Sequence, residues 1–197
     1  MSLVDDRPRR LDDDRLRRFA GLLLRWNATL NLIAARDAGG VWERHIADSL
    51  QLVPLMPAGV TRAVDLGTGG GFPGLVLAIA TGVAFDLIES DQRKAAFLRT
   101  AVLETGASAT VHCCRIEDAA LPPAAVVTAR ALAPLPRLLP LAAPLLTPDG
   151  VCLLLKGAKV EAELAAADRD WTMVVRRVPS QTSSEGVVLR VSELRAR

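Results

Sequence analysis

Apolar residues near the N-terminus recur at helical spacing. From Asp12 onward they line one face of a predicted helix, at Leu16, Phe19, Ala20, Leu23 and Leu30. The acidic residues at positions 12–14 are candidates for the N-cap and suit the positive end of the helix dipole. A second helix is predicted over about 41–55, where prolines at 54 and 57 close it. Residues 1–61 are therefore predicted to form an N-terminal helical extension.

From Arg62 onward the pattern changes to short apolar strands that alternate with helices. Strands are predicted at 63–66, 84–89, 110–113, 125–130 and 151–156, and helices at 74–81, 91–105 and 160–170. Repeated strand–helix–strand units with short connections indicate a parallel, doubly wound sheet. Between the fourth and fifth strands, residues 134–146 are apolar but carry four prolines, which predicts a broken helix.

The C-terminal part predicts a different kind of pairing. Segments 172–178 and 187–191 flank a polar turn at 180–186, which is typical of an antiparallel hairpin. The predicted fold class is thus α/β, with residues 62–197 forming a mostly parallel seven-stranded sheet that ends in a C-terminal antiparallel hairpin.

The first predicted strand of this core ends in an acid and runs into a glycine-rich loop. Asp65 is followed by glycines at 67, 69, 70 and 71, which lack a Cβ, so backbone N–H groups can approach a ligand closely. An acid at this place would repel a pyrophosphate but attract a cation. S-adenosylmethionine carries a sulfonium and an ammonium and no phosphate. The arrangement therefore looks like the first motif of the Rossmann-like, class I methyltransferases.

The glycines alone do not exclude a dinucleotide cofactor such as NAD. A Gly-x-Gly-x-x-Gly pattern that starts at Gly67 fails at Phe72, but one that starts at Gly69 is satisfied. Glu89, which ends the second predicted strand, lies 22 residues after Gly67. This spacing is close to the roughly 20 residues at which an acid meets ribose hydroxyls. We expect Asp65 and Glu89 to serve the cofactor, the alternative being that both cap strand ends and face solvent.

Length and composition limit the possible class of protein. The chain has 197 residues, which fits one domain with a small appendage, and no apolar stretch reaches the roughly 20 residues that cross a bilayer. The first ten residues lack the apolar segment of a secretory signal, and the three cysteines lack metal-ligand spacing. We therefore expect a cytoplasmic protein with no membrane and no metal, and a monomer by default. The net charge of +2 restricts any nucleic-acid surface to a local patch.

Short motifs along most of the chain carry a closer resemblance. Residues 26–32 read Trp-Asn-Ala-Thr-Leu-Asn-Leu, residues 44–49 read Arg-His-Ile-Ala-Asp-Ser, and the glycine loop at 67–74 contains a proline. Segments 90–98, 115–117, 129–131 and 155–157 follow in matching order. In these motifs the chain resembles the bacterial small-subunit (16S) ribosomal RNA guanine-N7 methyltransferases, the RsmG family, formerly called GidB. It departs from the family at Ile33, where threonine is usual, and at Glu89, where aspartate is commoner.

The resemblance implies methylation of guanine N7 at one site in 16S ribosomal RNA, near the decoding region, with S-adenosylmethionine as the methyl donor. The implied partner is 16S ribosomal RNA or an assembling small ribosomal subunit. With the loop residues argued above, the expected cofactor-binding residues are Asp65, Gly67, Gly69, Phe72, Glu89, Ile116, Glu117 and Arg130. Guanine N7 carries a lone pair and no proton, so we expect no catalytic base. Asn31 and Asp48 are candidates to position the guanine.

Basic residues near the carboxyl ends of predicted strands, or on adjoining helices, are candidates to bind RNA phosphates. They are Arg44, His45, Arg93, Lys94 and Lys156. Two alternatives stay open: Arg93 and Lys94 would also suit an ordinary solvated helix start, and His45 would also suit a hydrogen bond that fastens the N-terminal helices to the core.

The sequence also bears on other functions. His45, Asp48 and Ser49 superficially suggest a hydrolase triad, but the Gly-x-Ser-x-Gly turn that such a nucleophile needs is absent from the sequence. The remaining alternatives are a non-catalytic RNA- or ribosome-binding module, a small-molecule methyltransferase and a nicotinamide oxidoreductase.

Overall fold

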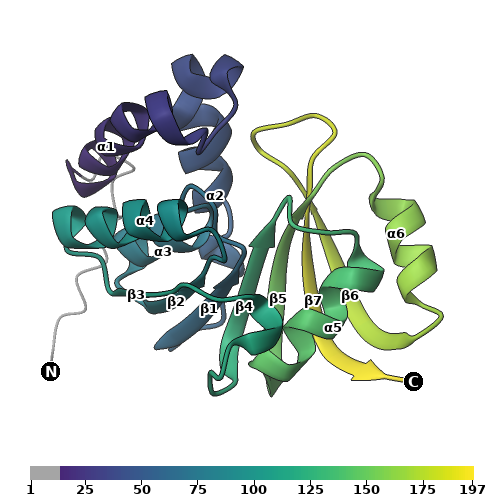
Figure 1. Ribbon diagram of the computed structural model, residues 1–197. Helices are drawn as coiled ribbons and strands as arrows, with labels where there is room; N and C mark the ends of the chain where they lie inside the picture. The colour runs from purple at the N-terminus through teal and green to yellow at the C-terminus, as the bar shows by residue number, and fades with distance from the viewer. Residues whose placement is uncertain (1–13) are drawn as a thin grey trace, which may run out of the picture.

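One seven-stranded sheet runs through residues 14–197, the part of the chain that the computed structural model describes (Figure 1). Its strands are β1 Arg62–Leu66, β2 Ala84–Ile88, β3 Ala109–His112, β4 Ala124–Arg130, β5 Leu146–Lys156, β6 Trp171–Pro179 and β7 Val187–Ala196. Their order is β3-β2-β1-β4-β5-β7-β6. Neighbours from β3 to β5 are parallel, and β7 is antiparallel to both β5 and β6. The predicted sheet with its closing hairpin is confirmed.

Helices cover both faces of this sheet, with α3 and α4 on one face and α5 and α6 on the other (Figure 1). The helices are α1 Asp14–Leu30, α2 Asp48–Leu50, α3 Gly74–Thr81, α4 Gln92–Thr105, α5 Leu135–Ala142 and α6 Val160–Ala167. Asp91 caps α4 by accepting hydrogen bonds from the backbone N–H groups of Arg93 and Lys94. None of the helices in the described residues is long and apolar enough to cross a membrane.

Several predicted boundaries differ from the structure. The helix expected over about 41–55 is a π-helical segment, Trp42–Ala47, followed by the short α2 and a separate 3₁₀ turn at Val53–Leu55. Proline at 54 lacks the N–H group that an α-helix would need there, which explains why α2 does not continue through this position. Strand β5 begins five residues earlier than 151, and α6 ends at Ala167 and not at 170. Of the predicted N-cap candidates, Asp12 and Asp13 lie outside the described residues.

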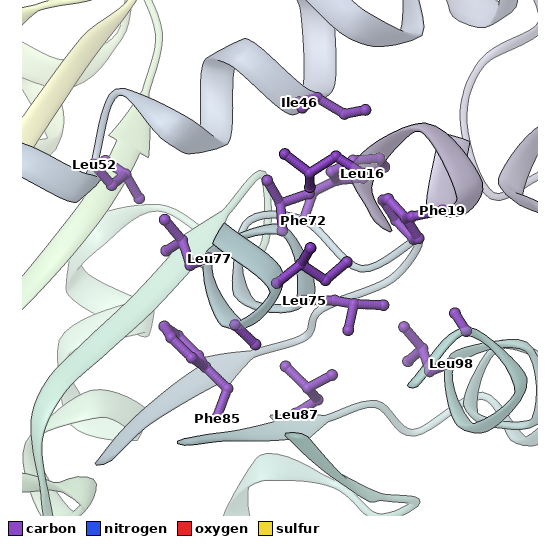
Figure 2. Packing of buried hydrophobic residues seen from close by; sticks show 14 of the residues in the cluster. Leu16, Phe19, Ile46, Leu52, Phe72, Leu75, Leu77, Phe85, Leu87 and Leu98 are labelled. Atoms are coloured by element: carbon purple, nitrogen blue, oxygen red, sulfur yellow. The ribbon is translucent and has the colours of Figure 1, made fainter. Parts of the chain in front are cut away.

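The N-terminal segment packs onto the face of the sheet that carries the glycine loop (Figure 2). Phe19 of α1 is fully buried, and its ring lies 5.6 Å from that of Phe72 and 6.4 Å from that of Phe97 of α4. Ile46 and Leu52 belong to the same cluster. Residues of the segment 14–61 therefore share one hydrophobic core with the sheet, whose first strand begins at residue 62. The organisation into two parts, 1–61 and 62–197, stays a prediction.

Candidate functional site

A cleft of about 750 Å³ opens at the carboxyl ends of the parallel strands, which is where open α/β sheets bind ligands. Seven of the eight predicted cofactor residues line it, the exception being Asp65: Gly67, Gly69, Phe72, Glu89, Ile116, Glu117 and Arg130. They come from the loops that follow β1, β2 and β3 and, for Arg130, from the last position of β4. The fold therefore assembles residues that lie more than 60 positions apart in the chain.

The glycine loop needs glycine for two separate reasons. Gly67, Gly69 and Gly71 have φ angles of +63°, +55° and +96°, in the region that side chains rarely adopt. At Gly67 a Cβ would also lie 2.6 Å from Cδ1 of Leu132, so that side chain would have to move, whereas at Gly69 the nearest atom of the described residues beyond the chain neighbours is the Gly67 carbonyl oxygen at 3.9 Å. The backbone at Gly67 is thus closed in by the β4–α5 connection, and the backbone at Gly69 has free space in front of it.

Asp65 lies beneath the loop, fully buried, and does not line the cleft. Its carboxylate accepts hydrogen bonds from the Thr128 hydroxyl at 2.6 Å and from the Gly74 backbone N–H at 3.0 Å. Burial raises the pKa of Asp65 to about 6, an effect that these hydrogen bonds partly offset. The side chain therefore fixes the start of α3 beside the loop.

Glu89 joins two loops at the floor of the cleft. One carboxylate oxygen accepts the Gly69 N–H at 2.9 Å, and the other accepts the Asp91 N–H at 2.8 Å. A carboxylate offers about four lone-pair sites, so each oxygen can accept a further hydrogen bond. Glu89 remains 8% exposed, which suits a role in which it holds the glycine loop and binds a ribose hydroxyl pair.

Arg130 lies at the edge of the cleft, packed over the ring of Phe72 at 4.9 Å. Its guanidinium donates to Nδ1 of His45 at 2.8 Å and to the carboxylate of Asp48 at 3.1 Å. Since Nδ1 accepts this bond, a neutral His45 carries its proton on Nε2, which is buried without a hydrogen-bond partner among the described residues. Burial, followed by the charge of Arg130, lowers the pKa of His45 to about 4. His45 is thus neutral and supports Arg130.

The two predicted guanine-positioning residues differ in their surroundings. Asp48 accepts from Arg130, from the Gln51 side-chain amide at 2.7 Å and from the Thr182 hydroxyl at 2.6 Å, so it ties the N-terminal segment to β4 and to the β6–β7 loop. Asn31 is exposed, does not line the cleft, and has a φ of +48°, which ends α1. The structure brings Asp48 close to the cleft and leaves Asn31 at the end of a helix.

Three of the predicted RNA-binding residues lie at the surface or in the cleft. Arg44 is exposed and pairs with Asp37 at 2.8 Å. Arg93 is exposed and donates to the Thr29 carbonyl at 3.1 Å, while Lys94 lines the cleft. These three can reach a phosphate from the surface.

Lys156 makes contacts inside the protein. Its ammonium lies 2.6 Å from Glu163 and donates to the Ala133 carbonyl at 2.8 Å, and its side chain is 9% exposed. These contacts favour a structural role for Lys156, and its expected phosphate contact stays a prediction. Lys156 joins the end of β5 to α6 and to the β4–α5 connection. The pairing of Lys156 with Glu163 could not be predicted from the sequence, because Glu163 lies on a different element.

Two residues that shape the site were missed from the sequence. Thr128 holds Asp65, and Leu132 covers Gly67. Neither belongs to a motif, and only their positions at the end of β4 and just after it gave a signal. In the described residues no group of three or more His, Cys, Asp or Glu side chains is placed to hold a metal ion.

The sheet order, the glycine loop after β1 and the acid after β2 define a Rossmann-like, class I methyltransferase fold. Solved structures agree on the fold. A SAM-dependent methyltransferase from Aquifex aeolicus superposes with a TM-score of 0.63 at 14% identity, covering 79% of this chain and 93% of that one. An O-methyltransferase from Bacillus cereus in complex with SAH gives 0.58 at 16% identity, covering 88% and 90%.

The chain belongs to the GidB family, described as rRNA small subunit methyltransferase G, which matches residues 12–188. Among its relatives is the ribosomal RNA small subunit methyltransferase G of Acidiphilium cryptum, 58% identical over 183 residues, or 91% of this chain and 84% of that protein. The protein of the same name from Gluconobacter oxydans is 56% identical, over 92% of this chain and 94% of that protein. The family resemblance found in the sequence is confirmed.

Proposed function

We propose that this chain transfers a methyl group from S-adenosylmethionine to N7 of one guanine in 16S ribosomal RNA. The observation that carries the proposal is the cleft, in which seven of the eight predicted cofactor-binding residues meet at the carboxyl ends of the strands. Family membership and relatives named ribosomal RNA small subunit methyltransferase G support the substrate. Action as a monomer in the cytoplasm is part of the same proposal.

The residues of the cleft fit S-adenosylmethionine by their chemistry. The open space before the Gly69 backbone and the adjacent carboxylate of Glu89 suit a ribose, and Ile116 and Glu117 supply an apolar and a hydrogen-bonding contact for the adenine. A buried carboxylate beneath the loop, Asp65, favours a cationic ligand over a pyrophosphate. When bound, the cofactor supplies an activated methyl group on a sulfonium.

The proposed reaction places few demands on proton transfer. The N7 lone pair attacks the methyl carbon while the carbon–sulfur bond breaks, so no proton leaves the guanine during bond formation. His45 does not serve as a base in this scheme, because its lone pair at Nδ1 is engaged by Arg130. The protein contributes alignment, which is worth up to roughly 7 to 11 kcal/mol in favourable cases.

Two measurements test the proposal. Calorimetry with S-adenosylhomocysteine and with NAD separates the two cofactor classes, and binding of NAD alone would overturn the assignment. Mass mapping of ribosomal RNA after incubation with the protein and an isotope-labelled methyl donor then locates the product. We expect one labelled guanine in 16S RNA. Label on a small molecule, or none on RNA, would refute the substrate.

A further inference from the structure

A second cavity of about 320 Å³ adjoins the cofactor cleft and shares part of its wall. Arg130 and Ala131 line both spaces. The remaining wall comes from the end of β5 at residues 155–158, from Asp48 and from the β6–β7 loop. This loop rises beyond the end of β4 in Figure 1. A group in the second cavity would therefore reach the cofactor cleft past the shared residues at the end of β4.

The loop that closes this cavity has a defined shape. The Ser180 N–H donates to the Gly186 carbonyl at 3.0 Å, and the Gly186 N–H donates to the Ser183 carbonyl at 3.2 Å. At Gly186 a Cβ would lie 2.7 Å from Cβ of Ser180, so only glycine permits this closure. The Thr182 hydroxyl fixes the loop to Asp48. Asp48 thus accepts hydrogen bonds both from Thr182 of the loop and from Arg130 of β4, and it lines the cavity between them.

The charged groups in the cavity are engaged, with one exception. Lys156 pairs with Glu163, and Asp48 pairs with Arg130. Glu185 lines the cavity and is exposed, and no contact with the described residues 14–197 occupies its carboxylate. The cavity therefore presents one free acceptor of two hydrogen bonds, mounted on a loop of fixed shape.

We infer that this second cavity receives the target base and that Glu185 selects guanine by its Watson–Crick edge. This inference rests on the proposed function. Guanine offers adjacent donors at N1 and N2, which a carboxylate accepts together, whereas adenine has an acceptor at N1 that a carboxylate repels. Binding through N1 and N2 leaves N7 free on another edge of the base. The target nucleotide has to leave its stack to enter the cavity.

The test combines a substitution in the protein with one in the RNA. The substrate carries either guanosine or inosine at the mapped methylation site, since inosine lacks only the N2 amino group. Glu185→Gln replaces one acceptor oxygen with an NH₂ group, which opposes the N2 donor. We expect kcat/KM on the guanosine substrate to fall about 10- to 100-fold, the range for loss of a bidentate base contact. The affinity for S-adenosylhomocysteine should stay unchanged.

The decisive readout is the coupling between the two changes. In the unsubstituted protein, kcat/KM should be about 10-fold lower on the inosine substrate than on the guanosine substrate. In Glu185→Gln the two substrates should have nearly the same kcat/KM. Glu104→Gln, which removes an exposed negative charge on α4 outside both cavities, serves as the matched control for altered attraction to RNA. It should retain both the rate and the full inosine penalty.

Unchanged kcat/KM in Glu185→Gln, or an inosine penalty equal in both proteins, would overturn the inference while the proposed function stands. If the unsubstituted protein transfers no methyl group to guanine, the proposed function fails as well, and the inference with it.

Discussion

Replacing Asp65 with asparagine should change how the stability of the protein depends on pH. Burial raises the pKa of this carboxyl from 3.8 to about 6. The folded state therefore binds the proton more tightly than the unfolded chain, and stability is lost as pH rises from the unfolded to the folded pKa. At 1.36 kcal/mol per unit, the full cost of ionising Asp65 in place is about 3 kcal/mol above pH 6.

Asparagine can keep the local hydrogen bonds without this cost. Its oxygen can accept from the Gly74 N–H, and its amide can donate to the Thr128 hydroxyl oxygen, which lies 3.5 Å from the Val64 carbonyl. The stability of Asp65→Asn relative to the unsubstituted protein should thus rise by about 2 kcal/mol between about pH 4.5 and 7.5. Affinity for S-adenosylhomocysteine at neutral pH should fall, because the buried charge that favours a cation is gone.

Urea unfolding followed at several pH values measures the difference in the free energy of unfolding directly, since other titrating groups cancel between the two proteins. Asp149→Asn, at an exposed position of β5, is the matched control and should show no such gain. A difference between Asp65→Asn and the unsubstituted protein that does not vary with pH would refute the account of Asp65 as a desolvated carboxylate.

Three further predictions concern the loop and the charged residues. Gly67→Ala and Gly69→Ala should each weaken binding of S-adenosylhomocysteine, because φ angles of +63° and +55° are unfavourable for a residue with a Cβ; calorimetry on both variants measures this, and unchanged affinity in both would contradict it. Lys156→Ala should lower the free energy of unfolding by about 2–4 kcal/mol by leaving Glu163 unpaired, while the salt dependence of RNA binding stays as it is. Lys94→Ala should instead leave stability unchanged and reduce the slope of log affinity against log salt by about 0.7, provided that its ammonium contacts a phosphate.

The part of the fold that local sequence determines was predicted well. Glycine at positive φ, a proline at the start of α3 and the acid before the loop act within ten residues of one another, so their pattern is readable from the chain. The helix at 91–105 was predicted for the same reason, since Asp91 caps it and Gly106 ends it in the left-handed conformation.

Contacts between distant elements were not readable in this way. Lys156 and Glu163 sit on β5 and α6, and Asp48 meets Thr182 across 134 positions of sequence, so no local pattern indicates that these charges are engaged. The continuous helix predicted over about 41–55 was wrong. Its apolar spacing fits such a helix, whereas the backbone is π-helical at Trp42–Ala47 and forms a separate 3₁₀ turn at Val53–Leu55.

We propose that this cleft directs a methyl group to N7 of one guanine. N7-methylguanosine in RNA is cleaved by aniline after borohydride reduction, while unmodified guanosine is not. 16S ribosomal RNA lacking the modification, given to the purified protein with S-adenosylmethionine and then treated in this way, should break at a single guanine. Methyl incorporation without cleavage would place the methyl on another atom, and the absence of both would contradict the account.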